Sequence, residues 1–365
     1  MKIQSKKYEQ IVEMLATEIA GREREGRESP ARFPSERSLA QRFGVSRETV
    51  RKAVGELEER GMIYRRSGVG SFVSGKARGA KTRIAALFTG SCDCEVFSVI
   101  EREIVRQASA AGFDVVRPDV SGVDAGDNDC SAVELARKIA AERVQGVIFQ
   151  PVDFSEATAS VNVEIIRIFS GKGIPVVLVD RDAEESPGWS GCTLVALDNL
   201  FAGRQLAEHL KNRLVGRVAF IAREGCAESV RRRMAGVKSV FGDSSVDYVT
   251  VPDHPSREQL ISALSRLSRL DSIVCQNDAI AVKVAEALAS MGLSVPSDVL
   301  LAGFDDIAVA SRMHPQLTTI RQPCEQIATV AFRRLRELMK EPSLPAVSVL
   351  LHGELKARGS TDIYR

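Results

Sequence analysis

The sequence predicts two domains, a small α+β domain at the amino terminus and a larger α/β domain that folds as two lobes. Residues 1–82 hold 18 Lys or Arg against 11 Asp or Glu, a net charge of +7, whereas residues 83–365 hold 32 against 37, a net charge of −5. Beyond residue 83, short β-branched segments alternate with amphipathic helical segments, the pattern of parallel β-α-β units. We therefore expect domains at 1–74 and 83–365, joined by a basic, small-residue linker at 75–82.

The small domain contains two predicted helices joined by a tight turn. Ser35 can cap the first helix, which runs to about Arg42, and Gly44 allows the positive φ with which helices often end. Ser46 can cap the second helix through its hydroxyl. Apolar residues of that helix recur at i, i+3, i+4 and i+7 and must face the core: Val50, Ala53, Val54 and Leu57. An earlier amphipathic helix supplies Tyr8, Ile11, Val12, Leu15 and Ile19.

The outer face of the second helix carries Arg47, Glu48 and Arg51. Two guanidinium groups one turn apart at the start of a major-groove helix can bond guanine acceptors or clamp phosphates, and the hydroxyl of Thr49 can add a contact. The segments 62–66 and 71–73 then flank a glycine-containing turn, the composition of a short hairpin whose backbone can approach DNA closely. Because these features follow one another within forty residues, we predict a winged helix-turn-helix that binds double-stranded DNA.

Residues 8–73 resemble the DNA-binding domain of the gluconate-repressor (GntR) family. They carry its Pro-Ser-Glu-Arg signature at 34–37 and its Val-Ser-Arg-x-Thr-Val-Arg signature at 45–51. The resemblance implies operator contacts by Arg37, Arg47 and Arg51, with the wing glycine Gly70 near the minor groove. Glu48 is a departure that bears on which operator is bound. The full set of predicted DNA-binding residues is Arg37, Ser46, Arg47, Thr49, Arg51, Gly68 and Gly70.

The larger domain shows nine β-branched segments in about 280 residues, more than one compact sheet comfortably takes. We therefore expect two parallel, doubly wound sheets with a cleft at the carboxyl ends of their strands. No glycine-rich dinucleotide fingerprint or Walker sequence follows any of these segments, which disfavours an ordinary nicotinamide enzyme or a nucleotide hydrolase. The predicted strands lie at 84–88, 115–117, 146–150, 176–179, 194–197, 218–221, 246–251, 273–275 and 299–304.

Six motifs of the larger domain resemble the effector domain of the lactose and galactose repressor (LacI/GalR) family, which is similar to periplasmic sugar-binding proteins. They lie at 174–181, 198–199, 233–236, 277–281, 295–306 and 317–323. Joined to a GntR-type domain, this resembles the arabinose repressor architecture. The resemblance implies one lobe from about 84–180 plus 305–325, and another from about 181–304 plus the carboxyl-terminal segment, with ligand between them.

The same resemblance assigns ligand contacts. Arg233 matches the family arginine that holds ligand, and Asp278 matches an acid that accepts from ligand hydroxyl groups. The alternative for Arg233 is an ordinary surface residue, and the alternative for Asp278 is a helix N-cap. Trp189 is either an aromatic side chain that covers one face of a bound sugar or an exposed loop residue without a role in binding. Ala227 stands where purine-binding members place an arginine, so a sugar is preferred to a purine. The predicted effector-binding residues are Phe97, Arg181, Ser229, Arg233, His254 and Asp278.

Composition limits the remaining possibilities. The seven cysteines lack paired metal-ligand spacing, and Cys92-x-Cys94 has no histidine nearby, so we expect free thiols, no metal, no cofactor and a reduced cytoplasm. The segment 1–10 is charged and shows no signal-peptide core, and no apolar stretch is long enough to cross a membrane. Only four histidines are present, which disfavours a sugar-processing enzyme. A ligand-independent architectural DNA-binding protein is the other alternative.

The sequence therefore predicts a transcription regulator, not an enzyme, whose operator affinity is controlled by a small molecule, preferably a sugar. Two chains are expected to form a homodimer that meets a two-fold operator, because the symmetry of a C2 dimer matches that of a palindromic site. Repression relieved by ligand is the usual direction in the family, and ligand as corepressor is the open alternative.

Overall fold

The computed structural model describes residues 8, 11–19, 33–59, 62–66, 70–73, 82–88, 95–117, 128–152, 156–183, 189–267 and 271–362. The chain divides into two compact units, Met1–Lys81 and Thr82–Arg365. Of the predicted linker at 75–82, only Thr82 lies within the described residues. The wing residue Gly68 and the Cys92-x-Cys94 pair fall outside them.

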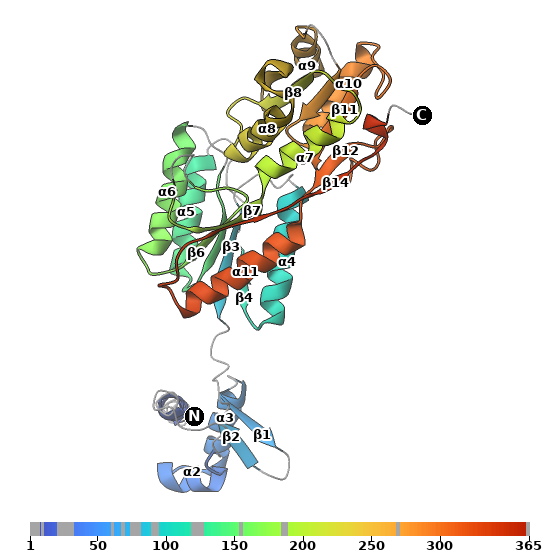
Figure 1. Ribbon diagram of the computed structural model, residues 1–365. Coiled ribbons are helices and arrows are strands. Elements are labelled where there is room, and N and C mark those ends of the chain that lie inside the picture. Colours follow the sequence, from blue (N-terminus) through green and yellow to red (C-terminus); the bar gives the residue numbers. More distant parts are fainter. Residues whose placement is uncertain are drawn as a thin grey trace. The chain divides into compact units, whose positions relative to one another are not determined.

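The first unit is a winged helix-turn-helix (Figure 1). Residues 11–19 are helical and precede α2 (Glu36–Phe43), α3 (Arg47–Glu59) and an antiparallel hairpin of β1 (Ile63–Arg66) and β2 (Gly70–Val73). The predicted turn is confirmed, since the Ser35 side chain accepts from the Ser38 N–H and Gly44 ends α2 with φ of 62°. The predicted apolar faces share one core with further residues of the unit, and of the predicted residues Tyr8 is only half-buried against it. The buried members are Ile11, Val12, Leu15, Ile19, Phe33, Leu39, Val50, Ala53, Val54, Leu57, Ile63 and Val73.

The second unit contains two six-stranded sheets, each wound with helices on both faces (Figure 1). The first sheet runs in the order β13-β7-β6-β5-β3-β4 and is parallel throughout. Helices α4 (Glu95–Ala110) and α11 (Cys324–Lys340) share one core with this sheet, and α5 (Asn128–Ala141) and α6 (Glu156–Ser170) share the other. Its strands are β3 (Arg83–Phe88), β4 (Asp114–Val116), β5 (Val147–Gln150), β6 (Val176–Val179), β7 (Thr193–Leu197) and β13 (Ser348–Leu351).

The second sheet runs in the order β14-β12-β11-β10-β8-β9, and only β14, at its edge, is antiparallel to its neighbour. Helices α7 (Asn199–Lys211) and α8 (Glu228–Phe241) pack on one face, and α9 (Arg257–Leu264) and α10 (Asp278–Ser290) on the other. Its strands are β8 (Val218–Arg223), β9 (Val246–Val251), β10 (Ser272–Cys275), β11 (Leu300–Asp305), β12 (Thr318–Arg321) and β14 (Glu354–Lys356). Short 3-10 turns lie at Asp243–Ser245 and Gly359–Thr361.

All nine predicted strands are present, but the expected lobe boundaries were wrong. Strand β7 belongs to the first sheet, because its residues are buried on both faces between β6 and β13. Strand β12 belongs to the second sheet, because it pairs in parallel with β11, the strand immediately before it. The chain therefore crosses between the lobes after β7, after β12 and after β13. Within the part of the chain described here, no helix is long and apolar enough to cross a membrane.

Candidate DNA-binding and effector sites

The start of helix α3 presents the predicted DNA-binding residues on its exposed side. The Ser46 hydroxyl oxygen accepts from the Thr49 N–H at 3.2 Å and lies 2.8 Å from the Thr49 hydroxyl oxygen, so these two side chains close the first turn. Arg47 is exposed beside them. The Arg51 side chain is 69% exposed, and its Nε lies 3.5 Å from Glu36 Oε2 of α2. This ion pair joins α3 to α2, and it could not be predicted from the local sequence because its two residues lie on different helices.

The hairpin and helix α2 supply the other predicted contacts. Arg37 is exposed on α2. Gly70 is exposed at the start of β2 with φ of 127°, a backbone conformation that a side chain would strain. The rings of Tyr64 and Phe72 stack with centroids 5.7 Å apart and stiffen the hairpin. The first unit thus has the exposed arginines and the glycine that contact with DNA requires.

Arg233 of α8 is the centre of a buried polar cluster at the carboxyl ends of β10 and β11. Its Nε donates to Asn199 Oδ1 at 2.8 Å, and its Nη1 donates to the Gln276 carbonyl at 2.6 Å. Its Nη2 lies 3.3 Å from Asp305 Oδ1, and the guanidinium sits over the Phe304 ring, 4.8 Å from the centroid. Arg233 is therefore a buried cation held by a carboxylate and two polar groups. The alternative interpretation of Arg233 as a surface residue was wrong.

The approach of α7 to α8 sets the place of Arg233. A Cβ on Gly203 of α7 would overlap the Arg233 carbonyl oxygen, and a Cβ on Gly236 of α8 would overlap the Leu200 carbonyl oxygen. Two facing glycines thus allow the helix backbones to touch. This contact brings Asn199, at the start of α7, within reach of the Arg233 side chain.

Asp278 lies at the start of α10 and is fully buried. Its Oδ1 accepts from the Thr319 hydroxyl at 2.7 Å, and its Oδ2 accepts from the Ile307 N–H at 3.1 Å. The helix cap considered for Asp278 belongs to Asn277, whose side chain accepts from the Ile280 N–H. Burial, with a smaller contribution from the charge of Asp305, raises the pKa of Asp278 well above its usual value.

Asp305, at the end of β11, is the acid that pairs with Arg233, and sequence reasoning did not single it out. Burial raises the pKa of Asp305 above its usual value, Arg233 opposes this effect, and the charge of Asp180 adds to it. Asp180 directly follows β6 (Val176–Val179) in the first lobe. Its own Oδ2 accepts from the Arg181 Nε at 2.8 Å, and both side chains are buried. Each lobe therefore holds one buried arginine–aspartate pair close to the carboxyl end of a strand.

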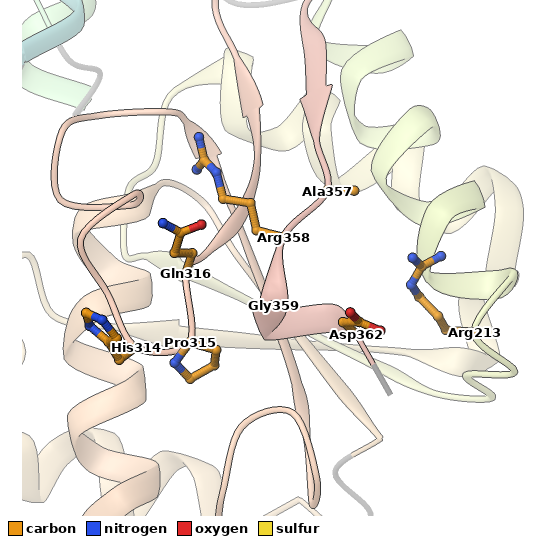
Figure 2. A pocket seen from close by; sticks show the side chains of 8 residues that line it. All are labelled: Arg213, His314, Pro315, Gln316, Ala357, Arg358, Gly359 and Asp362. Atoms are coloured by element: carbon orange, nitrogen blue, oxygen red, sulfur yellow. The ribbon is translucent and has the colours of Figure 1, made fainter. Parts of the chain in front are cut away.

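The remaining predicted effector residues differ in exposure. Ser229 is buried in the first turn of α8, and Phe97 of α4 is half-buried with its ring centroid 6.5 Å from that of Phe88. The His254 side chain is 90% exposed beside Asp253, and Trp189 is 59% exposed. A pocket of about 600 Å³ elsewhere in the second lobe involves none of the predicted residues (Figure 2). It lies at the amino end of β12 and is lined by Arg213, His314, Pro315, Gln316, Ala357, Arg358, Gly359 and Asp362.

Comparison with known proteins agrees with both units. Residues 7–73 match the family of bacterial regulatory proteins called the gntR family, and residues 207–361 match the periplasmic binding protein-like domain. The two matches define a DNA-binding transcription regulator that joins a GntR-type winged helix to a periplasmic binding protein-like domain. It is 27% identical to the arabinose metabolism transcriptional repressor of Geobacillus stearothermophilus, over 90% of this chain and 91% of that protein.

Solved structures support the fold of the second unit. A LacI family transcriptional regulator from Enterococcus faecium with bound ribose matches with a TM-score of 0.62 and 20% identity, over 78% of this chain and all of that one. The transcription regulator GntR from Chromobacterium violaceum matches with a TM-score of 0.60 and 24% identity, over 76% of this chain and 99% of that one. At these identities the comparison establishes the two-lobed fold alone.

Proposed function

We propose that this chain represses genes of sugar metabolism and that a neutral sugar bound between its lobes controls its affinity for operator DNA. The observation that carries the proposal is the buried Arg233–Asp305 pair at the carboxyl ends of parallel strands. Related proteins agree in kind, since one is an arabinose repressor and another holds ribose.

The chemistry of the cluster suits a polyol. A guanidinium offers a rigid fork of donors and a carboxylate accepts from two hydroxyls, so together they fix the orientation of vicinal hydroxyl groups. Because Arg233 and Arg181 each have an aspartate partner, their charges are compensated, which favours a neutral sugar over a sugar acid or a sugar phosphate. We propose Phe97, Arg181, Ser229 and Arg233 as contacts, with Asp305 as the principal acid. His254 is a contact at the rim of the cleft. Asp278 supports the site indirectly, through its hydrogen bonds to Thr319 and Ile307.

For DNA we propose that two chains form a homodimer whose α3 helices enter the major groove at the two halves of an operator. Arg47 and Arg51 contact bases or phosphates there, while Ser46 and Thr49 set the start of the helix. Arg37 of α2 contacts the phosphate backbone, and the wing glycines Gly68 and Gly70 lie at the minor groove. We further propose that the protein acts in the cytoplasm and has no enzymatic activity of its own.

A thermal-shift screen with pentoses, hexoses, sugar acids, sugar phosphates and purines tests the effector site. A ligand present at about 100 times its dissociation constant stabilises a protein by about 2.7 kcal/mol. We expect a neutral sugar to raise the melting temperature of the second unit. A rise in melting temperature with purines or sugar phosphates but not with any neutral sugar would contradict the proposal. Operator titration with and without that sugar then decides its role: release identifies an inducer, and tighter binding identifies a corepressor.

A further inference from the structure

Four consecutive residues, from the last residue of β11 to Ala308, are each held by a different part of the second unit. Asp305 pairs with Arg233, and the Asp306 carboxylate accepts from Arg321 at 2.7 Å and from Arg358 at 2.6 Å. The next two residues are held through their backbone N–H groups. That of Ile307 donates to Asp278 at 3.1 Å, and that of Ala308 donates to Glu95 Oε2 at 2.9 Å.

The last of these contacts joins the two lobes. Glu95 begins α4 in the first lobe, whereas Ala308 follows β11 in the second. The Ile307 side chain also packs against the first-lobe core that α4 and α11 form with the sheet. The segment 305–308 is thus attached to the second lobe through Asp305, Asp306 and the Ile307 N–H, and to the first lobe through the Ile307 side chain and the Ala308 N–H.

The backbone of this segment is strained, which makes its anchors important. Asp305 has φ of 108° and Asp306 has φ of 54°, values that residues with a side chain seldom adopt. Such conformations persist only when the surrounding contacts determine them fully. Loss of one anchor should therefore change the position of its neighbours.

We propose that the segment 305–308 couples the effector site to the first lobe and that Glu95 is the positioning residue that holds it there. The inference rests on the proposed function, because it takes Asp305 as an effector contact. A sugar that engages Asp305 shifts one end of the segment, and the Glu95 hydrogen bond passes that shift to α4. The Glu95 carboxylate suits this role, because a negative charge in the first turn of a helix is stabilised by the helix dipole.

The test compares Glu95→Leu, which removes the acceptor, with Glu95→Gln, which keeps an acceptor oxygen on a side chain of the same length. Glu101→Leu is the control, since Glu101 lies on the same helix and its ion-pair partner is Arg117. Amide hydrogen exchange over residues 305–312 of the full chain, measured without sugar, reports the contact itself. Binding of L-arabinose and D-ribose, measured by calorimetry, reports the coupling.

Glu95→Leu should speed exchange of the Ala308 amide about tenfold and raise the sugar dissociation constant about threefold to tenfold, the effect of losing one ordinary hydrogen bond. Glu95→Gln and Glu101→Leu should stay within about twofold of the unchanged chain. Unaltered exchange in Glu95→Leu, equal effects of Leu and Gln, or faster exchange with unaltered sugar affinity would each overturn the inference. If the unchanged chain binds neither sugar, the proposed function loses support, while the exchange result still decides whether Glu95 holds the segment.

Discussion

Arg233 and Asp305 form a buried ion pair at the carboxyl end of β11 in the second sheet, with Arg233 Nη2 3.3 Å from Asp305 Oδ1. The two residues are far apart in sequence, and α8 and β11 bring them together. A pair of this kind costs desolvation free energy and is weak evidence for stability by itself. Its place at the carboxyl ends of parallel strands, where such folds bind ligands, indicates a functional role instead.

Asp305→Asn should remove the charge that compensates Arg233 while keeping the shape of the side chain. We expect sugar affinity to fall at least about tenfold and the free energy of unfolding to fall by about 1.5–3 kcal/mol, because a charged hydrogen bond is lost in a buried site. Operator affinity without sugar should be unchanged. The exposed Asp243, changed to Asn, is the control. Sugar binding equal to that of the unchanged chain would exclude Asp305 as a contact.

Asp278→Ala should abolish the response to sugar and leave operator binding intact. The cause is indirect, since both carboxylate oxygens are occupied by Thr319 and Ile307. Each partner left without its acceptor should cost about 1–3 kcal/mol of unfolding free energy. Chemical denaturation and operator titration measure the two effects. Loss of operator binding by a chain that remains folded would remove Asp278 from the effector site.

Arg47→Ala should weaken operator binding by about 1–3 kcal/mol and relax specificity at one base position. The Arg47 side chain is exposed at the start of α3, so the folded unit should keep its stability. Competition binding with operators altered one base pair at a time, at fixed salt, measures this loss. Arg232→Ala, an exposed arginine of α8, controls for the change in net charge. Equal weakening across all operator variants would assign Arg47 to phosphate instead of base contact.

Gly203→Ala should destabilise the second unit, because its Cβ would overlap the Arg233 carbonyl oxygen. Overpacking of this kind typically costs about 1–3 kcal/mol, and the displaced α8 should also weaken sugar binding. Gly55→Ala in α3 is the matched control, since a Cβ there meets no atom within 4 Å and alanine favours a helix. Thermal unfolding of the two variants should show opposite signs. A neutral Gly203→Ala would disprove the close helix contact.

His209 predicts a loss of stability in mild acid. Burial, aided by the charge of Arg213, lowers the pKa of His209 from 6.5 to about 4, and its Nε2 lies 2.8 Å from the Thr361 hydroxyl. His209 is therefore protonated below about pH 6.5 in the unfolded chain but only below about pH 4 in the folded chain. Its contribution to stability is present above pH 6.5 and is lost as the pH falls through this window, by at most about 1.4 kcal/mol per pH unit. Chemical denaturation of His209→Gln should show a free energy of unfolding that depends less steeply on pH between 6.5 and 4 than that of the unchanged chain.

The sequence identified most of the local structure because local structure depends on nearby residues. The caps at Ser35 and Ser46, the turn at Gly44 and the nine strand segments all followed from short-range patterns. The lobe boundaries did not, because strand order depends on pairing between distant segments, as for β7 with β13.

The effector cluster shows the same limit. Arg233 stands out in a recognisable motif, but its partner could not be read from that motif. Asp305 ends one buried strand and Asp278 comes shortly after another. Only their three-dimensional contacts show that Asp305 pairs with Arg233, whereas Asp278 accepts from the Ile307 N–H.

The last two strands complete both sheets. Strand β13 adds to β7 of the first sheet, and three residues later β14 adds to β12 of the second. During synthesis, therefore, one edge strand of each sheet, β7 in the first and β12 in the second, lacks its neighbour until almost the whole chain has left the ribosome. The winged helix, at the opposite end of the sequence, can fold long before that. A premature stop after α11 would release a DNA-binding head attached to an effector domain in which neither lobe can be finished.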